Sequence, residues 1–137
     1  VSGVDAQGQV AHALKPDGAR GAPLLAYSEE SGLGRILREA SGERLARLNL
    51  QTTFTAHLAS VLRTMALGGR GIAWLPMTLV ADDLATGRLV QVGSSEWDIA
   101  LDIRLFRDKR AHGAAAEVFW QAVLRQAEQT PSVAPQG

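Results

Sequence analysis

Residues 53–80 show the clearest succession of hydrophobic patterns in the chain. Apolar residues there recur at the i, i+3, i+4, i+7 spacing that puts them on one helical face: Leu58, Val61, Leu62 and Met65. This spacing predicts a helix that begins at Thr55 or Ala56 and ends at Leu67. Gly68 and Gly69 predict its end, because glycine accepts the left-handed backbone common there. Residues 71–76 are then continuously apolar, which predicts a strand covered on both faces.

The preceding residues predict further strands and one helix. Glycines and prolines interrupt residues 1–23, including a turn at Asp17-Gly18, and leave room only for a short strand or hairpin. Residues 24–28 predict a buried strand, and residues 51–54 a second one. The helix between them has Ser28 or Ser31 as its N-cap. We expect it to end near Ala40, where residues 41–43 break the pattern.

The C-terminal half predicts two more helices and two strands. A short helix follows Pro76 and stops at Gly87. Residues 88–92 are typical of an edge strand, residues 93–95 of a loop, and residues 98–107 alternate strictly between apolar and polar. Residues 114–128 predict the last helix, which carries on one side Val118, Phe119, Ala122 and Val123. The tail from Thr130 is expected to fray.

Three successive strand and helix units predict an α/β layer with a largely parallel sheet, since parallel neighbours need crossover helices. Ligands of such sheets bind at the carboxyl ends of the strands, beside helix N-termini. In this chain those ends are expected at Tyr27-Ser28, Thr53-Phe54 and Leu75-Pro76. The hydroxyls gathered there are expected to cap helices, to bind a ligand, or both: Ser28, Ser31, Thr52, Thr53 and Thr55.

Amino-acid composition restricts the kinds of partner that the protein is expected to bind. The 137 residues form one domain by length, with 46% hydrophobic residues and 14 basic against 14 acidic side chains. This balance argues against direct binding to nucleic acid or to an anionic membrane. The lack of cysteine excludes thiol chemistry and fits a cytoplasmic protein. No apolar run spans a bilayer. The N-terminus has neither an initiator Met nor a signal pattern, so the start at Val1 is interpreted as a cut.

Catalytic and metal chemistry find little support in the motifs. His12, His57 and His112 lie in different predicted elements without a second ligand at helical spacing, and His57 is expected at the surface of a first helical turn. Neither a Gly-x-Ser-x-Gly elbow nor a Gly-x-x-x-x-Gly-Lys phosphate loop is present. We therefore expect no catalytic residue, no metal and no cofactor.

Two weaker patterns have structural explanations. Gly32-Leu33-Gly34 opens a helix after a strand, but Leu37 stands where a dinucleotide loop needs a small residue, so these glycines are interpreted as easing a turn. The pairs Glu29-Glu30 and Asp82-Asp83 are interpreted as first-turn or solvated acids, because adjacent helical residues point apart. Redox sensing is open only to Met65 or Met77, whose alternative role is core packing.

Several runs together resemble the effector-binding region of LysR-type transcriptional regulators. They are Pro23-Leu24-Leu25-Ala26-Tyr27-Ser28, Gly32-Leu33-Gly34-Arg35, Met65-Ala66-Leu67-Gly68, Gly71-Ile72-Ala73-Trp74-Leu75-Pro76, Asp83-Leu84 and Gly87-Arg88-Leu89-Val90. The resemblance covers about residues 20–107 and extends to the final helix. The Tyr-Ser and Leu-Gly-Arg runs are similar to a subgroup related to hypochlorite-responsive regulators.

The resemblance implies an α/β fold like a type 2 periplasmic binding protein, with a mostly parallel sheet flanked by helices and an incomplete first lobe. Residues from about 8 to 100 would form the second lobe, and residues 1–7 and 105–130 remnants of the first. The second-lobe wall of the effector cleft would comprise Ser28, Ser31, Thr53, Leu75 and Pro76. A helix matching residues 56–67 would pair the subunits through His57, Ser60, Val61 and Thr64.

The resemblance also implies the partners: a small, anionic effector, a second copy of the chain in a homodimer or larger homo-oligomer, and DNA only through an absent N-terminal helix-turn-helix. No membrane partner is implied. Two alternatives remain open, a free-standing small-molecule-binding protein and a small α/β enzyme. The first lacks an export signal and the second lacks a nucleophile and base in recognisable motifs.

Overall fold

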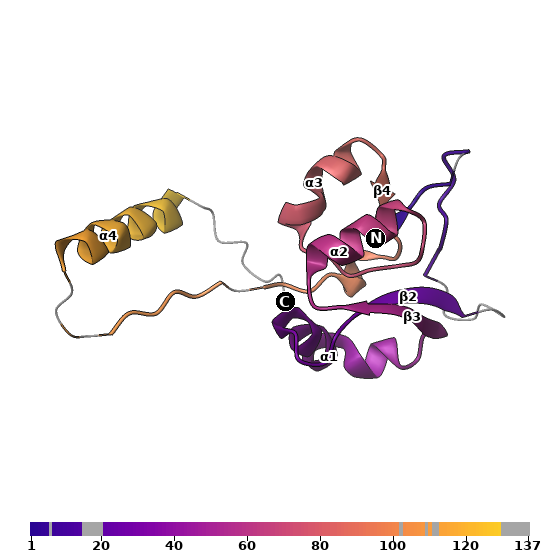
Figure 1. Ribbon diagram of the computed structural model, residues 1–137, viewed down its shortest axis with the longest axis horizontal. Coiled ribbons are helices and arrows are strands. Elements are labelled where there is room, and N and C mark those ends of the chain that lie inside the picture. Colours follow the sequence, from indigo (N-terminus) through magenta and orange to yellow (C-terminus); the bar gives the residue numbers. More distant parts are fainter. Residues whose placement is uncertain (6, 15–20, 102, 109, 111–112, 130–137) are drawn as a thin grey trace. The chain divides into compact units, whose positions relative to one another are not determined.

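The protein divides into two compact units, Val1–Ile99 and Ala100–Gly137. The computed structural model describes residues 1–5, 7–14, 21–101, 103–108, 110 and 113–129, and each unit is considered by itself. The predicted turn at Asp17-Gly18, His112 and the tail from Thr130 lie outside the described residues. Figure 1 shows the elements along the chain.

A parallel strand pair forms the half of the sheet that concerns ligand binding. Strand β2 (Ala22–Tyr27) pairs in parallel with β3 (Leu50–Ala56), with a register shift between Leu24 and Leu25. On its other side β2 bonds to the predicted strand at 71–76, of which only Ile72 is bridged to Leu24. The amide of Ile72 donates to the Pro23 carbonyl at 2.8 Å, and its own carbonyl accepts from Leu25 at 2.8 Å. This confirms an apolar parallel neighbour of β2.

The other half of the sheet is antiparallel, which the sequence pattern did not predict. Strand β1 (Ser2–Gly3) pairs with β4 (Leu89–Val90) and bridges Ile72 in the antiparallel sense. Gly3 packs so closely on the helix above it that a Cβ there would lie 2.2 Å from the Ala66 carbonyl oxygen. Residues 1–5 therefore pair within the first unit, Val1–Ile99. Their predicted assignment to the first lobe stays a prediction.

Helix α1 (Gly32–Leu45) begins where predicted but runs five residues beyond Ala40. Ser31 is its N-cap, and its side chain accepts from the Gly34 amide at 2.9 Å. The predicted break at 41–43 is wrong, because one glycine inside a helix costs only about 1 kcal/mol. Ser41 is buried at 4% exposure, so the helix remains packed through the supposed break.

Helix α2 (Ala59–Leu67) begins three residues later than the pattern predicted, because β3 continues to Ala56. Its buried side chains are Leu62 and Ala66, both at 0% exposure, while Leu58 is 63% and Val61 38% exposed. The apolar stripe thus includes two outward residues that periodicity alone assigns to the core. Gly69 has a φ of 67°, which confirms the predicted glycine stop.

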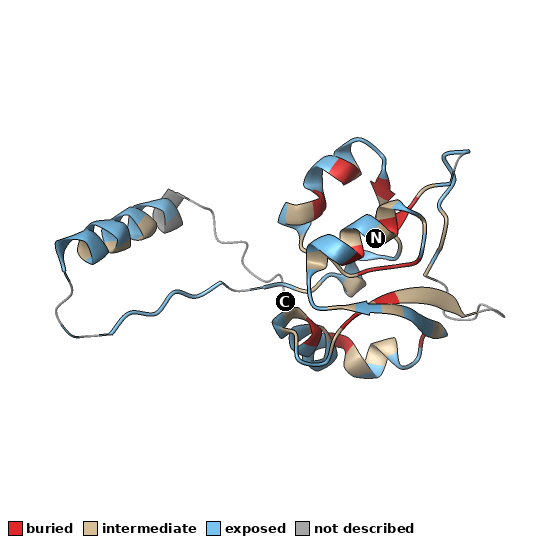
Figure 2. Cartoon of the chain, in the orientation of Figure 1, coloured by how far each residue is buried: buried red, intermediate tan, exposed pale blue. Residues whose placement is uncertain are grey.

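Helix α3 (Met77–Ala85) confirms the predicted third helix and ends before Gly87, which has a φ of 71°. Figure 1 shows α1 on one side of the β2–β3 pair and α2 on the other, as in a layered α/β lobe. The core of the unit is coloured red in Figure 2. Its buried cluster comprises Leu25, Tyr27, Leu62, Ala66, Ala73, Val80 and Leu89.

The chain leaves the first unit through a 3-10 turn, η1 (Ser95–Trp97). The strand predicted over 98–107 is wrong for the residues described there, none of which is in a strand. Ile103 is 93% and Phe106 87% exposed, because alternation makes a strand only when a neighbour supplies hydrogen bonds and cover. Helix α4 (Ala114–Gln129) confirms the last predicted helix, and its Val118 and Phe119 are 67% and 63% exposed.

Candidate functional site

The ends of β2 and β3 bring together two side chains that the sequence assigned to different roles. Ser28 follows the last residue of β2, and His57 follows the last residue of β3. The backbone amide of Ser28 donates to the Ala56 carbonyl at 3.0 Å. The Ser28 hydroxyl oxygen lies 2.6 Å from Nδ1 of His57, so the two side chains share a hydrogen bond. The strand pairing itself therefore holds the serine beside the imidazole.

Sequence reasoning missed this pair because it ended the second strand at Phe54 and placed His57 in a helix. A usable signal was present: Gln51-Thr52-Thr53-Phe54-Thr55 is rich in β-branched and aromatic residues. A strand that continues through this run ends at Ala56, which pairs with Tyr27 at the end of β2. His57 is exposed, as expected, but it lies outside helix α2.

The other predicted site residues lie in several elements of the first unit. Ser31 is committed to capping α1. Thr53 lies in the middle of β3, not at its end, and its hydroxyl donates to the Leu24 carbonyl at 3.4 Å. Pro76 is the N-cap residue of α3 and Leu75 precedes it, so this expected strand end does open a helix. Thr52 and Thr55 are exposed residues of β3.

The segment next to Leu75 is fixed by an aromatic contact. The indole Nε1 of Trp74 donates to the Trp97 carbonyl at 3.1 Å, and the two rings meet edge to face with centroids 6.3 Å apart. The guanidinium of Arg44 lies 4.6 Å from the Trp97 ring centroid, and its Nη2 donates to the Glu96 carbonyl at 2.5 Å. These contacts tie the end of α1, the segment before Pro76 and η1 into one body.

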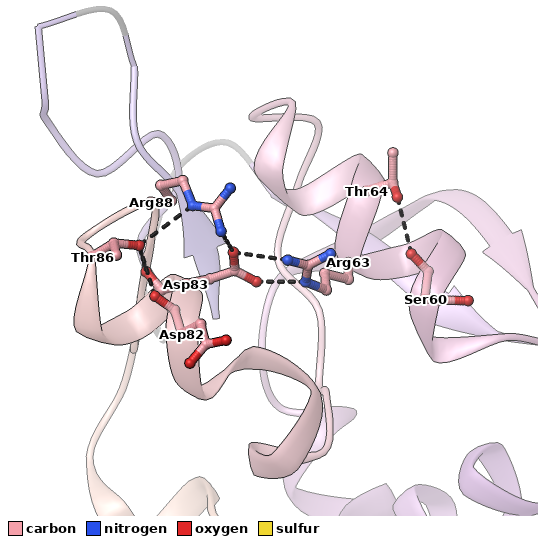
Figure 3. A network of polar contacts seen from close by, with 7 residues as sticks. All are labelled: Ser60, Arg63, Thr64, Asp82, Asp83, Thr86 and Arg88. Atoms are coloured by element: carbon pink, nitrogen blue, oxygen red, sulfur yellow. Dashed lines mark hydrogen bonds and ion pairs between the residues drawn. The ribbon is translucent and has the colours of Figure 1, made fainter.

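The predicted subunit-contact residues share an exposed surface of α2 and the loop before it. His57, Ser60, Val61 and Thr64 are all exposed. Leu58, on the same helix end, adds a large apolar side chain that is 63% exposed. Thr64 turns its hydroxyl back to the Ser60 carbonyl, 3.1 Å away, as Figure 3 shows. The face is therefore available for contact and apolar in part.

On the opposite flank of α2, a buried carboxylate corrects the interpretation of the acidic pair. Asp82 is exposed, as expected, but Asp83 has 0% exposure. Arg63 donates to it from Nε at 2.5 Å and from Nη2 at 2.9 Å, and Arg88 Nη2 lies 2.6 Å from Oδ1. Figure 3 shows both guanidinium groups directed at this carboxylate. The hydrogen bond from Arg63 holds the pKa of Asp83 below its ordinary value of 3.8.

Two other kinds of feature would bear on function among the described residues, a metal-binding group and a membrane-spanning helix. None of their histidine and acidic side chains form a group of three that could hold a metal ion. The helices among them are too short or too polar to cross a membrane. His12, the other described histidine, has Nε2 2.9 Å from the Gly69 carbonyl oxygen and belongs to the packing around α2.

A parallel strand pair between helices, with polar side chains at the strand ends, defines the class of α/β lobes that bind ligands at a sheet edge. The family model for the LysR substrate binding domain matches residues 8–128. The chain belongs to this family, which confirms the resemblance and its periplasmic-binding-protein-like α/β fold.

Solved and curated relatives agree with this assignment. The chain is 33% identical over 106 residues to the HTH-type transcriptional regulator YjiE of Escherichia coli strain K12, which covers 77% of this chain and 34% of YjiE. It has the same identity over 106 residues to QseD of Escherichia coli O157:H7, an HTH domain-truncated transcriptional regulator, covering 77% of the chain and 43% of QseD.

The regulatory domain of HypT from Salmonella typhimurium, solved in apo and bromide-ion-bound forms, is similar in structure. The TM-scores are 0.72 and 0.69 at 25% and 26% identity, over 94% and 90% of this chain and 60% and 58% of the HypT chains. Full-length HypT is described as a hypochlorite-specific LysR-type regulator. The chain spans less than half the length of the curated relatives that it matches.

Proposed function

We propose that the chain is the effector-sensing part of a cytoplasmic LysR-type transcriptional regulator, which binds a small anionic molecule and signals its presence to DNA through a dimer. The observation that carries the proposal is the meeting of Ser28 and His57 at the ends of two parallel strands, within a chain of this family. The bromide-bound form of HypT supports an anion as the ligand class.

In this proposal the first unit is the second lobe of the regulator, and residues 105–130 belong to the first lobe. One wall of the effector cleft comprises Ser28, Ser31, Thr53, Leu75 and Pro76. The effector acts by binding one arrangement of the lobes or subunits better than another, which shifts their populations. The DNA-binding helix-turn-helix is expected in the coding sequence upstream of Val1. Its absence there would contradict direct DNA binding by this protein and leave the truncated form that QseD represents.

The dimer contact in the proposal is the exposed face of α2, with His57, Ser60, Val61 and Thr64. In the full-length regulator, Val61→Glu places a charge at the centre of this face and should weaken dimerisation. Ala81→Glu, at an exposed position of α3, is the matched control. Analytical ultracentrifugation over a concentration series compares the two variants. Unchanged dimerisation of Val61→Glu would show that the dimer contact lies on another surface.

Binding of bromide, acetate and benzoate to the chain tests the cleft, with titration followed by two-dimensional NMR. Ser28→Ala and Thr53→Val remove one hydroxyl each and should both weaken binding. Ser94→Ala is the control, because the Ser94 hydroxyl, just before η1, donates to Glu96 Oε1 at 2.8 Å. Unchanged affinity in both Ser28→Ala and Thr53→Val would remove the site assignment.

The serine–imidazole pair favours one second candidate, a hydrolase, because a base beside a hydroxyl activates a nucleophile. The geometry argues against it. A catalytic triad uses Nε2 of the histidine toward the serine and a carboxylate on Nδ1. Here Nδ1 contacts Ser28, and no described carboxylate bonds to Nε2. Hydrolysis of p-nitrophenyl acetate that disappears in both Ser28→Ala and His57→Gln would favour the enzyme.

A further inference from the structure

The pair formed by Ser28 and His57 has a definite hydrogen-bonding capacity. If Ser28 donates to Nδ1, the proton of the neutral ring is on Nε2, and if Nδ1 donates, the serine hydrogen turns outward. Either way the neutral pair presents one donor hydrogen to a ligand. When the ring is an imidazolium, Nδ1 must donate to Ser28, and both the Ser28 hydroxyl and Nε2 then present hydrogens. Protonation thus fixes the Ser28 hydrogen outward and places a positive charge beside it.

The other charged residues around Ser28 and His57 determine how much the charge of an imidazolium changes the net charge of the site. Strand β3 has no charged residue, and the first turn of α1 has no acidic one. Helix α2 carries only Arg63, whose guanidinium is bound to Asp83. The loop after Ser28 has Glu29 and Glu30, both exposed.

Helix α1 offsets these two carboxylates with two guanidinium groups near its start, Arg35 and Arg38. Arg38 Nη2 donates to the Glu29 carbonyl at 2.7 Å, which places it over the loop. The fixed charges of α1 and the loop are therefore balanced at this end. The imidazolium of His57 is the group whose charge changes the sign of the site.

We propose that Ser28 and His57 form the anion-binding centre of the site, with His57 as a positioning residue whose imidazolium form turns the Ser28 hydrogen toward a small monoanion. The inference rests on the proposed function and adds a ligand contact and a pH dependence to it. The anion accepts a hydrogen bond from the Ser28 hydroxyl, and the imidazolium behind that hydroxyl contributes its charge, while Nε2–H points away on the other side of the ring. A halide or a carboxylate has the single charge and the acceptor capacity that this pair matches.

Bromide is the probe for the experiment because it keeps its charge at every pH. Its affinity for the chain is measured at pH 5.5 and pH 8.0 from the backbone amide resonances around Ser28, which every variant retains. We expect binding to be about fivefold tighter at pH 5.5, the factor that a unit charge about 4 Å away gives in water. Chloride-free buffers are used throughout because chloride would compete.

Variants separate the charge of His57 from its hydrogen bond. His57→Gln keeps an N–H donor without a titratable charge, so bromide binding should lose its pH dependence. His57→Ala loses the donor as well and should bind more weakly at both pH values. His12→Gln is the control, because the His12 ring bonds to the Gly69 carbonyl, and it should behave as the unmodified chain.

The outcomes distinguish the inference from the function on which it rests. Bromide affinity that is independent of pH, or equal in His57→Gln and the unmodified chain, overturns the role of His57. In that case the proposed site still stands if Ser28→Ala and Thr53→Val weaken binding. If neither bromide nor any carboxylate binds at either pH, both the inference and the anionic effector site are wrong.

Discussion

Arg63 donates two hydrogen bonds to Asp83, and this contact joins α2 to α3. Arg88, the residue before β4, adds an ion pair to the same carboxylate, with Nη2 2.6 Å from Oδ1, so one buried carboxylate connects three parts of the first unit. The helix that carries the proposed subunit contact on one flank is thus fixed by charge on the other. A change on either flank of α2 is expected to affect its position in the lobe.

Asp83→Asn should lower the stability of the chain much more than Asp82→Asn. The amide retains the size of the carboxylate but leaves Arg63 and Arg88 without a countercharge. Removal of one partner of a buried ion pair destabilises the folded state. Asp82 is exposed and forms no such contact through its carboxylate, so its substitution should leave the unfolding midpoint unchanged. Urea unfolding followed by circular dichroism compares the variants, and equal midpoints would contradict a structural role for the contact.

The same carboxylate predicts a limit to stability in acid. Because the pKa of Asp83 is lower in the folded state than the ordinary 3.8, the unfolded chain binds its proton first as the pH falls. The stabilisation is therefore complete above about pH 4 and is lost progressively as the pH falls through the lower folded-state pKa. Unfolding curves from pH 7 to pH 3 should show the gap between the unmodified chain and Asp83→Asn narrowing below pH 4. A constant gap would assign the effect to packing.

Leu62→Ala tests which face of α2 is the buried one. Leu62 has 0% exposure, and its truncation should lower the free energy of unfolding by about 2–5 kcal/mol through lost burial and a cavity. Leu58 is 63% exposed, so Leu58→Ala should change stability by about 0.5 kcal/mol or less. Both are measured by urea unfolding. Comparable losses in the two variants would mean that Leu58 is packed in solution, as the helical spacing first suggested.

Hydrophobic periodicity located most helices, because a helical face depends on local spacing. It failed where the structure of a segment depends on a partner that is distant in the sequence. Gly69 and Gly87 mark helix ends by their own backbone conformation, so the sequence predicts them well. The alternating residues around Ile103 need a neighbouring strand that local sequence does not specify. The burial of Asp83 was missed for the same reason. A carboxylate is expected in solvent unless it has a countercharge, and its partner Arg63 is 20 positions away in the sequence.

The candidate site shows the same division. The hydroxyl of Ser28 at the end of the first strand was predictable from the apolar run before it. Its contact with His57 depends on the length of β3, which is fixed by pairing with β2 and not by the residues of β3 alone. Pairing sets strand ends, so side chains that follow two strands are brought together only by the register between them.

Tyr27→Phe should stabilise the chain by about 1–3 kcal/mol, the usual penalty for a buried polar group without a partner. Tyr27 is 8% exposed, and its hydroxyl has no hydrogen bond among the described residues. Burial also raises the pKa of Tyr27 from 10.0 to about 12. The unfolded chain therefore releases this proton first, and stability should fall as the pH rises from 10 to 12. Tyr27→Phe should lack that contribution, and a lower stability at neutral pH would indicate an unseen partner such as an ordered water.

Helix α4 predicts self-association of the chain at high concentration. Its Val118 and Phe119 are 67% and 63% exposed, and the nearby segment exposes Ile103 and Phe106 almost fully. Large exposed apolar side chains in this number favour contact with another surface. Light scattering between 10 and 500 μM, values on the order of those at which exposed apolar surface drives association, should show a rising average mass. Val118→Lys should reduce the increase.

A lysine at a different position of α4 shows whether Val118→Lys acts by disrupting an apolar contact or by changing the net charge of the chain. Ala115→Lys adds the same charge at an exposed small residue of the same helix, and it should associate like the unmodified chain. If both lysine variants reduce association equally, general charge repulsion explains the effect. If the unmodified chain stays a monomer throughout, the exposed surface of α4 does not drive contact between copies. Reduced association in Val118→Lys alone would place the contact on this side of the helix.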